Sequence, residues 1–280
     1  MIARDRWLAV VLAGAGVCLV LLPFLWRLES ASFHLHETSW ILASEALFAE
    51  TFLGQPPSRS PEYALSFGWP SPPLGKYVMA LSVHLRVEDS LAGLARTSPP
   101  TFDRPIILSM ASGHVPPLDI LLSARLPMAL LGAATCVAIL WVGHCVWGTA
   151  TGAVAAGLLA LNPLMLACSR RAMIDAPALF FSALAVLLAL RVASSERRAI
   201  GASLGLGIAL GLAAASKLNA LAGACVTALL LLSPAGSLLR AASGSALALG
   251  AAIAVFILVN PYLYSETLER AVSMLTYAHA

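Results

Sequence analysis

Long apolar segments separated by short polar turns make up most of this chain. The first apolar run, Trp7 to Trp26, has 20 residues without a charge, and about 20 residues span the hydrocarbon core of a bilayer. A second run from Leu126 to Ser169 has 44 residues with no Asp, Glu, Lys or Arg. That length suits two spans, with the turn best placed at Gly148–Gly152. Further charge-free runs cover Ala176–Leu190, Ala199–Ser216, Leu218–Leu239 and Ala241–Ser265.

This pattern predicts about seven transmembrane helices and an all-α integral membrane protein. The composition agrees, since 59% of the residues are apolar, 11% are charged and the mean hydropathy is +0.85, whereas a soluble domain carries about 25% charge. The excess of 17 basic over 14 acidic residues is too small to indicate nucleic acid binding. All five cysteines fall in apolar segments without metal-binding spacing, so they are expected to be buried thiols.

One long polar loop interrupts the apolar pattern. We expect a single membrane domain, 1–280, with the first span in 1–28, an outside loop in 29–120, a six-span bundle in 121–265 and an outside C-terminal tail in 266–280.

Two helices are expected within the loop, over Ser39–Leu53 and Leu74–Val87. The second segment is amphipathic and too short to span, which favours a juxtamembrane helix on the membrane surface. Its expected apolar face holds Leu74, Tyr77, Val78, Leu81 and Leu85, with Lys76, Ser82 and Arg86 off that face. The remainder, 88–120, is expected to be irregular.

The distribution of arginine and lysine predicts the topology. Arg4 and Arg6 precede the first run, so the N-terminus is expected in the cytoplasm. A cleaved signal peptide is disfavoured because no small-residue cleavage site follows the run. The long loop and the C-terminus are then outside. Twelve of the 14 acidic residues fall outside as well, beside three cations in short turns, and this mixture suits an anionic ligand: the three are Arg170, Arg171 and Lys217.

Candidate site residues lie at the ends of the predicted spans. Arg170, Arg171 and Asp175 share one turn, Lys217 lies in another, and Arg125 begins the second span. Each cation has two interpretations, an ordinary interfacial charge whose stem lies in the apolar region or part of a phosphate site, because arginine presents a planar fork of donors.

In the long loop, Glu37 follows the first span closely, between His36 and a polar helix start, and Lys76 follows a proline-rich segment. Glu37 is either a solvated loop carboxylate or a catalytic one. Together with His34 and His36 it also has a weak metal-ligand spacing, and a divalent metal therefore stays open as a cofactor.

In order along the chain, these motifs resemble the GT-C class of membrane glycosyltransferases that use polyprenyl-phosphate sugars, such as the dolichyl-phosphate-mannose–protein mannosyltransferases and the aminoarabinose transferase of lipid A. The matching segments are His36–Trp40, Pro72–Lys76, Arg125–Gly132, Ser169–Asp175 and Lys217. The resemblance covers nearly the whole chain. Its motifs are individually unspecific, and their order against the spans carries the likeness.

The resemblance implies inverting transfer of a sugar from the carrier to an acceptor at the outer membrane face. A loop carboxylate takes the acceptor proton, and fixed cations stabilise the departing phosphate. Carried over, Glu37 is the expected base with His36 as helper or substitute, and Asp175 positions the acceptor or sugar. The phosphate site is expected to contain Lys76, Arg125, Arg170, Arg171 and Lys217.

Two departures from the family pattern leave alternatives open. The family usually has Asp-Glu where this chain has His36-Glu37, and its members are usually far longer. The expected function is a glycosyltransferase of the bacterial inner membrane, acting on a polyprenyl-phosphate sugar and a protein, lipid or glycan acceptor. The alternative is an inactive or truncated seven-span module that binds a lipid carrier or a partner subunit supplying further spans. A transporter is the weakest alternative, because the charges sit at span ends.

Overall fold

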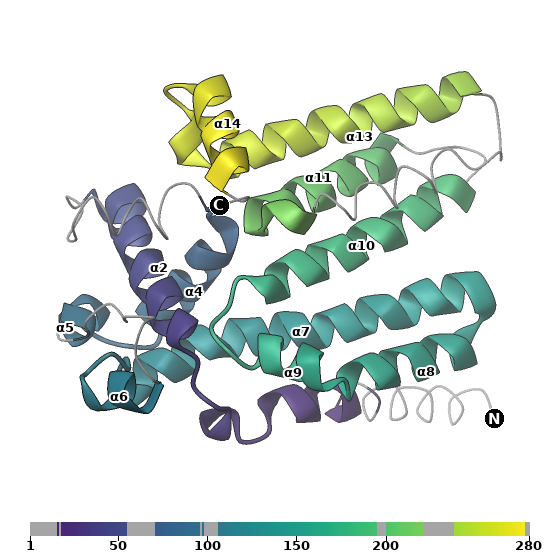
Figure 1. Ribbon diagram of the computed structural model, residues 1–280. Helices are drawn as coiled ribbons and strands as arrows, with labels where there is room; N and C mark the ends of the chain where they lie inside the picture. Colours follow the sequence, from purple (N-terminus) through teal and green to yellow (C-terminus); the bar gives the residue numbers. More distant parts are fainter. Residues whose placement is uncertain are drawn as a thin grey trace.

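A bundle of antiparallel helices forms the body of the protein in the computed structural model, which describes residues 16, 18–54, 71–95, 97, 106–194, 200–220 and 238–277. Within these ranges every regular element is helical. The bundle helices, drawn side by side in Figure 1, are α7 (Leu118–Trp147), α8 (Thr149–Ala160), α9 (Pro163–Ser169), α10 (Asp175–Ser194), α11 (Ile200–Ser216) and α13 (Leu238–Val259). The predicted all-helical class is confirmed for the described residues.

Two of the bundle helices, α7 and α10, are long and apolar enough to cross a membrane, and the bent pair α8–α9 makes a third if it is one span. Helix α11 and residues 244–259 of α13 are apolar but shorter. The predicted span at Trp7–Trp26 is described only at 16 and 18–26, and the one at Leu218–Leu239 lies largely outside the described residues. Seven spans therefore stay a prediction, whereas apolar helices of membrane-crossing length are observed.

The turn predicted at Gly148–Gly152 is confirmed. Helix α7 ends at Trp147 and α8 begins at Thr149, with Gly148 at φ 96°, a backbone region that glycine adopts without strain. The helices then cross closely, because a Cβ placed on Gly143 would clash with the backbone of Gly152. Glycine at both positions brings the two backbones together.

The apolar run after this turn is not one straight helix. Helices α8 and α9 meet at 65°. The side chain of Asn162 caps α9 by accepting a hydrogen bond from the backbone N–H of Met165 (3.0 Å), and Pro163 occupies its first turn. Proline has no N–H to donate to the preceding helix, so the chain turns there and directs the end of α9 toward the site.

The long loop forms a helical cap on one end of the bundle (Figure 1). Its elements are η1 (Leu28–Ser30), α2 (Leu35–Leu53), α4 (Leu74–His84), α5 (Ser90–Ala95) and α6 (Ile106–Ala111). Both predicted loop helices are thus confirmed, but the prediction of irregular structure over 88–120 is wrong where α5 and α6 form. Ile41 of α2, Met79 of α4 and Met128 of α7 share one buried cluster with Ile174, which fixes the cap on the bundle.

Helix α4 packs on the bundle with a face that its sequence pattern does not suggest. Lys76, Met79 and Val83 are buried, whereas Leu81 and Leu85 are exposed. The close approach at Gly75 explains this orientation, because a Cβ there would lie 3.0 Å from Cγ2 of Ile174. The expected apolar face therefore points in part away from the rest of the protein.

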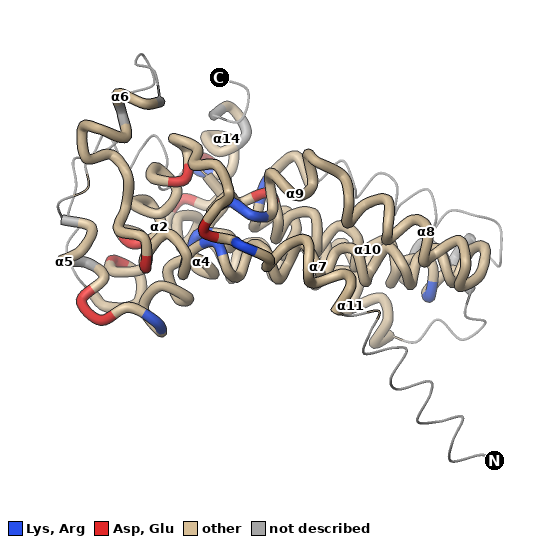
Figure 2. The backbone as a smooth tube through the Cα atoms, turned by 90° about the horizontal axis from the view of Figure 1, so that it is seen from below, with Lys and Arg blue, Asp and Glu red and all other residues tan. Residues whose placement is uncertain are grey.

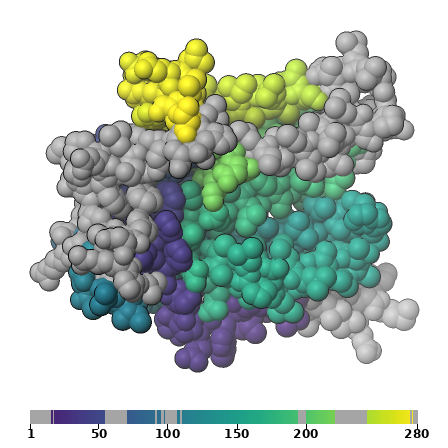
Figure 3. Space-filling model, viewed as in Figure 1, coloured from purple at the N-terminus to yellow at the C-terminus, as the bar shows by residue number. Residues whose placement is uncertain are grey.

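The C-terminal region adds three short elements, η3 (Leu218–Ala220), η4 (Pro261–Leu263) and α14 (Thr267–Tyr277). In the space-filling view the purple N-terminal segment lies directly against the green surface of the bundle (Figure 3), consistent with the burial of Phe24 among residues of α7, α8 and α9.

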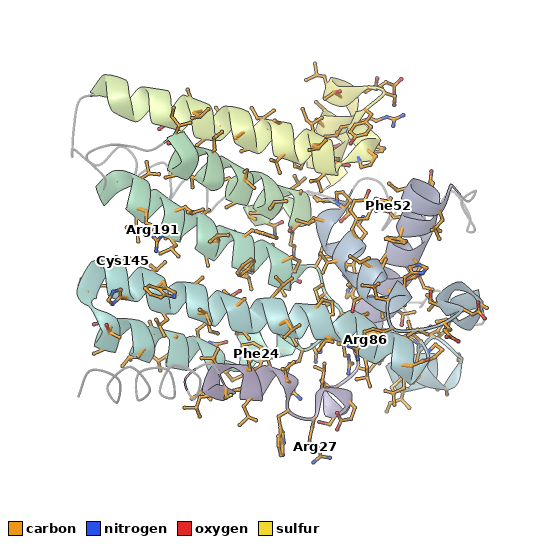
Figure 4. The ribbon with its side chains drawn as sticks, turned by 180° about the vertical axis from the view of Figure 1, so that it is seen from behind. Phe24, Arg27, Phe52, Arg86, Cys145 and Arg191 are labelled. Atoms are coloured by element: carbon orange, nitrogen blue, oxygen red, sulfur yellow. The ribbon has the colours of Figure 1, made fainter. Side chains whose placement is uncertain are left out.

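Charged residues gather at the capped end of the bundle (Figure 2). Figure 4 shows Phe52 and Arg86 at this end and Cys145 and Arg191 at the opposite end. The capped end contains the starts of α7 and α10 and the ends of α9 and α11, and all eight site residues predicted from the sequence lie on these elements, on the cap or in the adjoining turns.

Candidate functional site

The centre of the capped end is a buried ion pair between Glu37 and Arg125. Arg125 donates from Nε to Oε1 and from Nη2 to Oε2 of Glu37, both at 2.8 Å, in the bidentate geometry that arginine and carboxylate favour. Glu37 is 0% and Arg125 1% exposed. The pair is inside the protein, and neither side chain reaches solvent.

Backbone groups complete the coordination of both side chains. The carboxylate of Glu37 also accepts hydrogen bonds from the backbone N–H groups of His34 (3.0 Å) and Ala172 (2.9 Å). Arg125 donates from Nη1 to the carbonyl oxygens of Leu28 and Ala31. Through this network, η1, the start of α2, helix α7 and the turn after α9 all contact the same ion pair. Every charge in it is paired, as a buried ion pair requires.

Helix α2 begins at this network because its sequence supplies a capping box. His34 is the N-cap residue, and its Nδ1 accepts the backbone N–H of His36 at 3.2 Å. Glu37 returns the interaction by accepting the N–H of His34. Two otherwise unsatisfied donors of the first turn are thereby satisfied.

His36 lies in the first turn of α2 and is partly exposed. Its imidazole stacks on that of His34, with ring centroids 5.0 Å apart and an interplanar angle of 15°. Burial, followed by the neighbouring His34, lowers the pKa of His36 below its ordinary value, because both disfavour the charged form. His36 is thus predominantly neutral near pH 7.

The arginines after α9 hold the segment that precedes α2. Arg170 donates hydrogen bonds from Nη2 to the carbonyl oxygens of Trp26 and Arg27. Arg171 donates hydrogen bonds from Nε to the carbonyl oxygen of Ser32 (3.1 Å) and from Nη2 to the Ser32 hydroxyl (2.6 Å). Residues 31–37 therefore lie along residues 170–172, and this brings His36 and the turn that leads to Asp175 onto adjacent segments.

A second ion pair joins Asp175, the first residue of α10, to Lys217, which follows α11. Lys217 Nζ lies 2.6 Å from Oδ1 of Asp175, and the side chains are 36% and 25% exposed. Both act electrostatically on the thiol of Cys168, as does Arg171. These three charged groups are accordingly near one another at the end of α9.

Lys76 is fully buried at the start of α4, where its Nζ donates to the carbonyl oxygen of Ser71 at 2.8 Å. Burial lowers its pKa to about 7, because a charged ammonium is costly to remove from water. Gly75 places this helix start directly against Ile174, the neighbour of Asp175.

The structure thus separates the predicted site residues into two groups. Glu37, Arg125 and Lys76 are buried. His36, Arg170, Arg171, Asp175 and Lys217 are partly exposed, although both arginines also hold the segment that precedes α2. In the described part of the chain, no group of three or more His, Cys, Asp or Glu side chains is arranged to hold a metal ion.

Sequence reasoning did not identify the partners of these residues. Ser32, which receives Arg171, and the capping role of His34 were missed, although the spacing His34-x-x-Glu37 is a variant of the capping-box pattern. It also missed a buried cluster on the cap, where His84 Nε2 lies 2.9 Å from Oε2 of Glu45 and Ser90 Oγ lies 3.4 Å from Nδ1 of His84. Burial raises the pKa of Glu45 to about 8 and lowers that of His84.

Comparison with known proteins identifies the family. The sequence profile of the dolichyl-phosphate-mannose-protein mannosyltransferases matches residues 119–264, just over half of the chain. This chain belongs to that family. It is therefore a membrane protein of the GT-C glycosyltransferase group. Within the match lie Arg125, Arg170, Arg171, Asp175 and Lys217, whereas His36, Glu37 and Lys76 precede it.

A solved structure supports the mannosyltransferase fold. The chain is similar to the S. cerevisiae protein O-mannosyltransferase Pmt1-Pmt2 complex bound to the sugar donor, with a TM-score of 0.59 and 21% sequence identity over 95% of this chain. The similar region is 34% of that chain, so this chain spans about a third of its length. No curated protein sequence matches this chain significantly.

Proposed function

We propose that this protein transfers a sugar from a polyprenyl-phosphate carrier to an acceptor hydroxyl at the capped end of the bundle, with inversion at the anomeric carbon. The observation that carries this proposal is the cluster of partly exposed groups, Arg171, Asp175 and Lys217, in a member of the mannosyltransferase family. Arg171 contacts Ser32, in the segment that leads to His36. In the reaction the acceptor oxygen attacks the anomeric carbon, the bond to the phosphate oxygen breaks, and the acceptor loses its proton.

The contacts of Glu37 favour His36 as the group that takes this proton. Glu37 is buried and its carboxylate already accepts four hydrogen bonds, so a substrate hydroxyl has no route to it. His36 is partly exposed, and its lowered pKa favours the neutral imidazole, the form that accepts a proton, at neutral pH. We therefore reassign the base from Glu37 to His36 and give Glu37 the task of holding the segment that carries it.

The same argument divides the cations. Arg125 is buried against Glu37, whereas Arg170, Arg171 and Lys217 are partly exposed. Of these three, Arg171 and Lys217 both act electrostatically, with Asp175, on the thiol of Cys168. A carrier phosphate that approaches Lys217 replaces water and shares the cation with Asp175. We assign Lys217 and Arg171 to the departing phosphate, whose growing negative charge they stabilise. Lys76 is a further phosphate ligand if the helix start opens, and Asp175 positions Lys217 and the acceptor.

The setting in the cell belongs to the same proposal. The predicted topology places the capped end at the outer face of a bacterial inner membrane, where a lipid-linked donor and a protein, lipid or glycan acceptor are both available. A partner subunit that contributes to the acceptor site is part of this proposal, since the similar yeast protein is itself a complex.

Turnover in membranes enriched in this chain tests the proposal. Polyprenyl-phosphate hexoses are supplied, and the release of free polyprenyl phosphate is followed for the wild type, His36→Ala and His36→Asp. We expect His36→Ala to lower release by about 10²- to 10⁴-fold, the usual contribution of a general base. His36→Asp, which restores the usual family residue, is expected to retain release.

A matched control is Arg27→Gln, which is expected to leave release unchanged. The Arg27 side chain is 69% exposed, and its ion pair with Glu29 is long at 4.0 Å. Full turnover by His36→Ala would exclude His36 as the base. Absence of release from any donor by the wild type, with the carrier still bound, would favour the second candidate, a carrier-binding module without turnover.

A further inference from the structure

The region around His36 contains a residue that neither the family pattern nor the proposed reaction assigns. We propose that His34 is a positioning residue that holds the imidazole of His36 in place and keeps it in the neutral, proton-accepting form. This inference rests on the proposed function, because it concerns the group that takes the acceptor proton.

The first observation is the hydrogen bond that fixes His34. Its Nδ1 accepts the backbone N–H of His36, so Nδ1 carries no proton and the neutral ring has its proton on Nε2. The hydrogen bond fixes the orientation of the His34 ring beside the start of α2.

The second observation is the stacking of the two rings. At 5.0 Å and 15°, the ring of His34 covers one face of the His36 ring and excludes water from it. A proton on His36 would lose the hydration of that face, and a proton on each ring would place two like charges together. The stack also restricts rotation of His36 about its side-chain bonds, which orients its nitrogens.

The charged groups on the surrounding elements are engaged elsewhere. Glu37 binds Arg125 of α7, Arg171 binds Ser32, Lys217 binds Asp175 and Lys76 of α4 donates to the carbonyl of Ser71.

Replacement of His34 by asparagine separates its two tasks. Asparagine is a strong N-cap residue, so His34→Asn keeps the cap and removes the ring. We expect the thermal transition of His34→Asn to stay close to that of the wild type. We expect the pKa of His36 to rise toward its ordinary value, and the acidic limb of turnover to move to higher pH. The ratio of mutant to wild-type release then falls several-fold as the pH is lowered from about 8 to about 5.5.

Two readouts keep this proposal distinct from the proposed reaction. One is the pH profile of release. The other is the titration of His36 by NMR in protein labelled at histidine, reconstituted in lipid nanodiscs and assigned with His36→Gln. Unchanged titration and an unchanged profile in His34→Asn would overturn the role of His34.

The remaining outcomes are equally informative. Release that falls by the same factor at every pH, with a lowered thermal transition, would reduce His34 to a helix cap and overturn the proposal. A shifted titration of His36 without release from any donor by the wild type would remove the proposed reaction and support the effect of His34 on the ring.

Discussion

The two ion pairs at the capped end have the same chemistry and different surroundings. Glu37–Arg125 is buried and surrounded by backbone donors and acceptors, whereas Asp175–Lys217 is about one-third exposed. The cost of removing a charged pair completely from water is offset only when every polar group of the pair is hydrogen-bonded. Such a pair cannot exchange partners. An exposed pair is weak and can accept a ligand. The comparison suggests that the buried pair holds the cap in place and that the exposed pair is able to bind a ligand.

The largest effect is expected for Arg125→Leu. The substitution leaves the Glu37 carboxylate buried without its cation, which costs about 3–5 kcal/mol of stability, and the cap is expected to separate from α7. Thermal unfolding in detergent measures the loss. The double variant Arg125→Leu/Glu37→Gln removes the buried charge and should recover part of it. If Arg125→Leu unfolds at the wild-type temperature, the pair does not hold the cap.

Lys217→Gln should affect the reaction far more than the fold. The exposed pair contributes less than about 1 kcal/mol to stability, whereas the loss of one donor to the departing phosphate lowers turnover by about 10²-fold. Asp175→Asn, which leaves the lysine charged, provides the matched comparison and should lower turnover by a smaller factor. A loss of stability in Lys217→Gln as large as that in Arg125→Leu would remove the distinction between the two pairs.

Lys76 extends the comparison to a buried cation whose charge depends on pH. With a pKa of about 7, it is charged in the free protein below that pH and must take up a proton to bind an anion above it. If it contacts the carrier, affinity for a polyprenyl-phosphate hexose should fall by up to about tenfold per pH unit above 7.

Two substitutions at this position serve as controls for binding titrations over that range. Lys76→Arg keeps the charge at every pH, and Lys76→Met removes it, so each should bind with little dependence on pH. Identical pH dependence in the wild type and Lys76→Met would separate Lys76 from the phosphate site.

The smallest effect is expected at Glu45, a buried carboxylate paired with His84 instead of arginine. Its pKa is about 8 in the folded protein against an ordinary 4.5, so the stability that protonated Glu45 contributes is complete below pH 4.5 and is lost as pH rises through 8. Glu45→Gln stays neutral and should gain roughly 2–4 °C in melting temperature over the wild type between pH 6.5 and 9. His84, whose pKa is lowered, has already lost its proton in that window.

The control for this measurement is Glu29→Gln, because Glu29 is 55% exposed and near Arg27. It should follow the wild type at each pH. An equal slope in Glu45→Gln and the wild type would show that Glu45 is ionised throughout the range.

Part of this architecture could be predicted from the sequence. Local signals predicted the turn at Gly148–Gly152, helices over Ser39–Leu53 and Leu74–Val87, and the turn before Asp175, because glycine, proline and hydrophobic period act over a few residues. The structure has helices over Leu35–Leu53 and Leu74–His84. The bend at Asn162–Pro163 also has a local signal in the sequence, an N-cap residue followed by proline, but it was not predicted from the sequence. The buried face of α4 could not be found in this way, since Gly75 brings it against Ile174 about a hundred residues away.

By itself, the sequence determined that this is a helical membrane protein with polar chemistry at its span ends, and that its motifs follow the order of a mannosyltransferase. Only the tertiary structure decided what each motif residue does. Glu37 and Lys217 both appear in the sequence as charges beside apolar segments. Glu37 is enclosed and paired with Arg125, 88 positions further along the chain, whereas Lys217 is accessible. Burial and partner choice depend on contacts between distant segments, and these set the energy of a charge far more than its neighbours in sequence do.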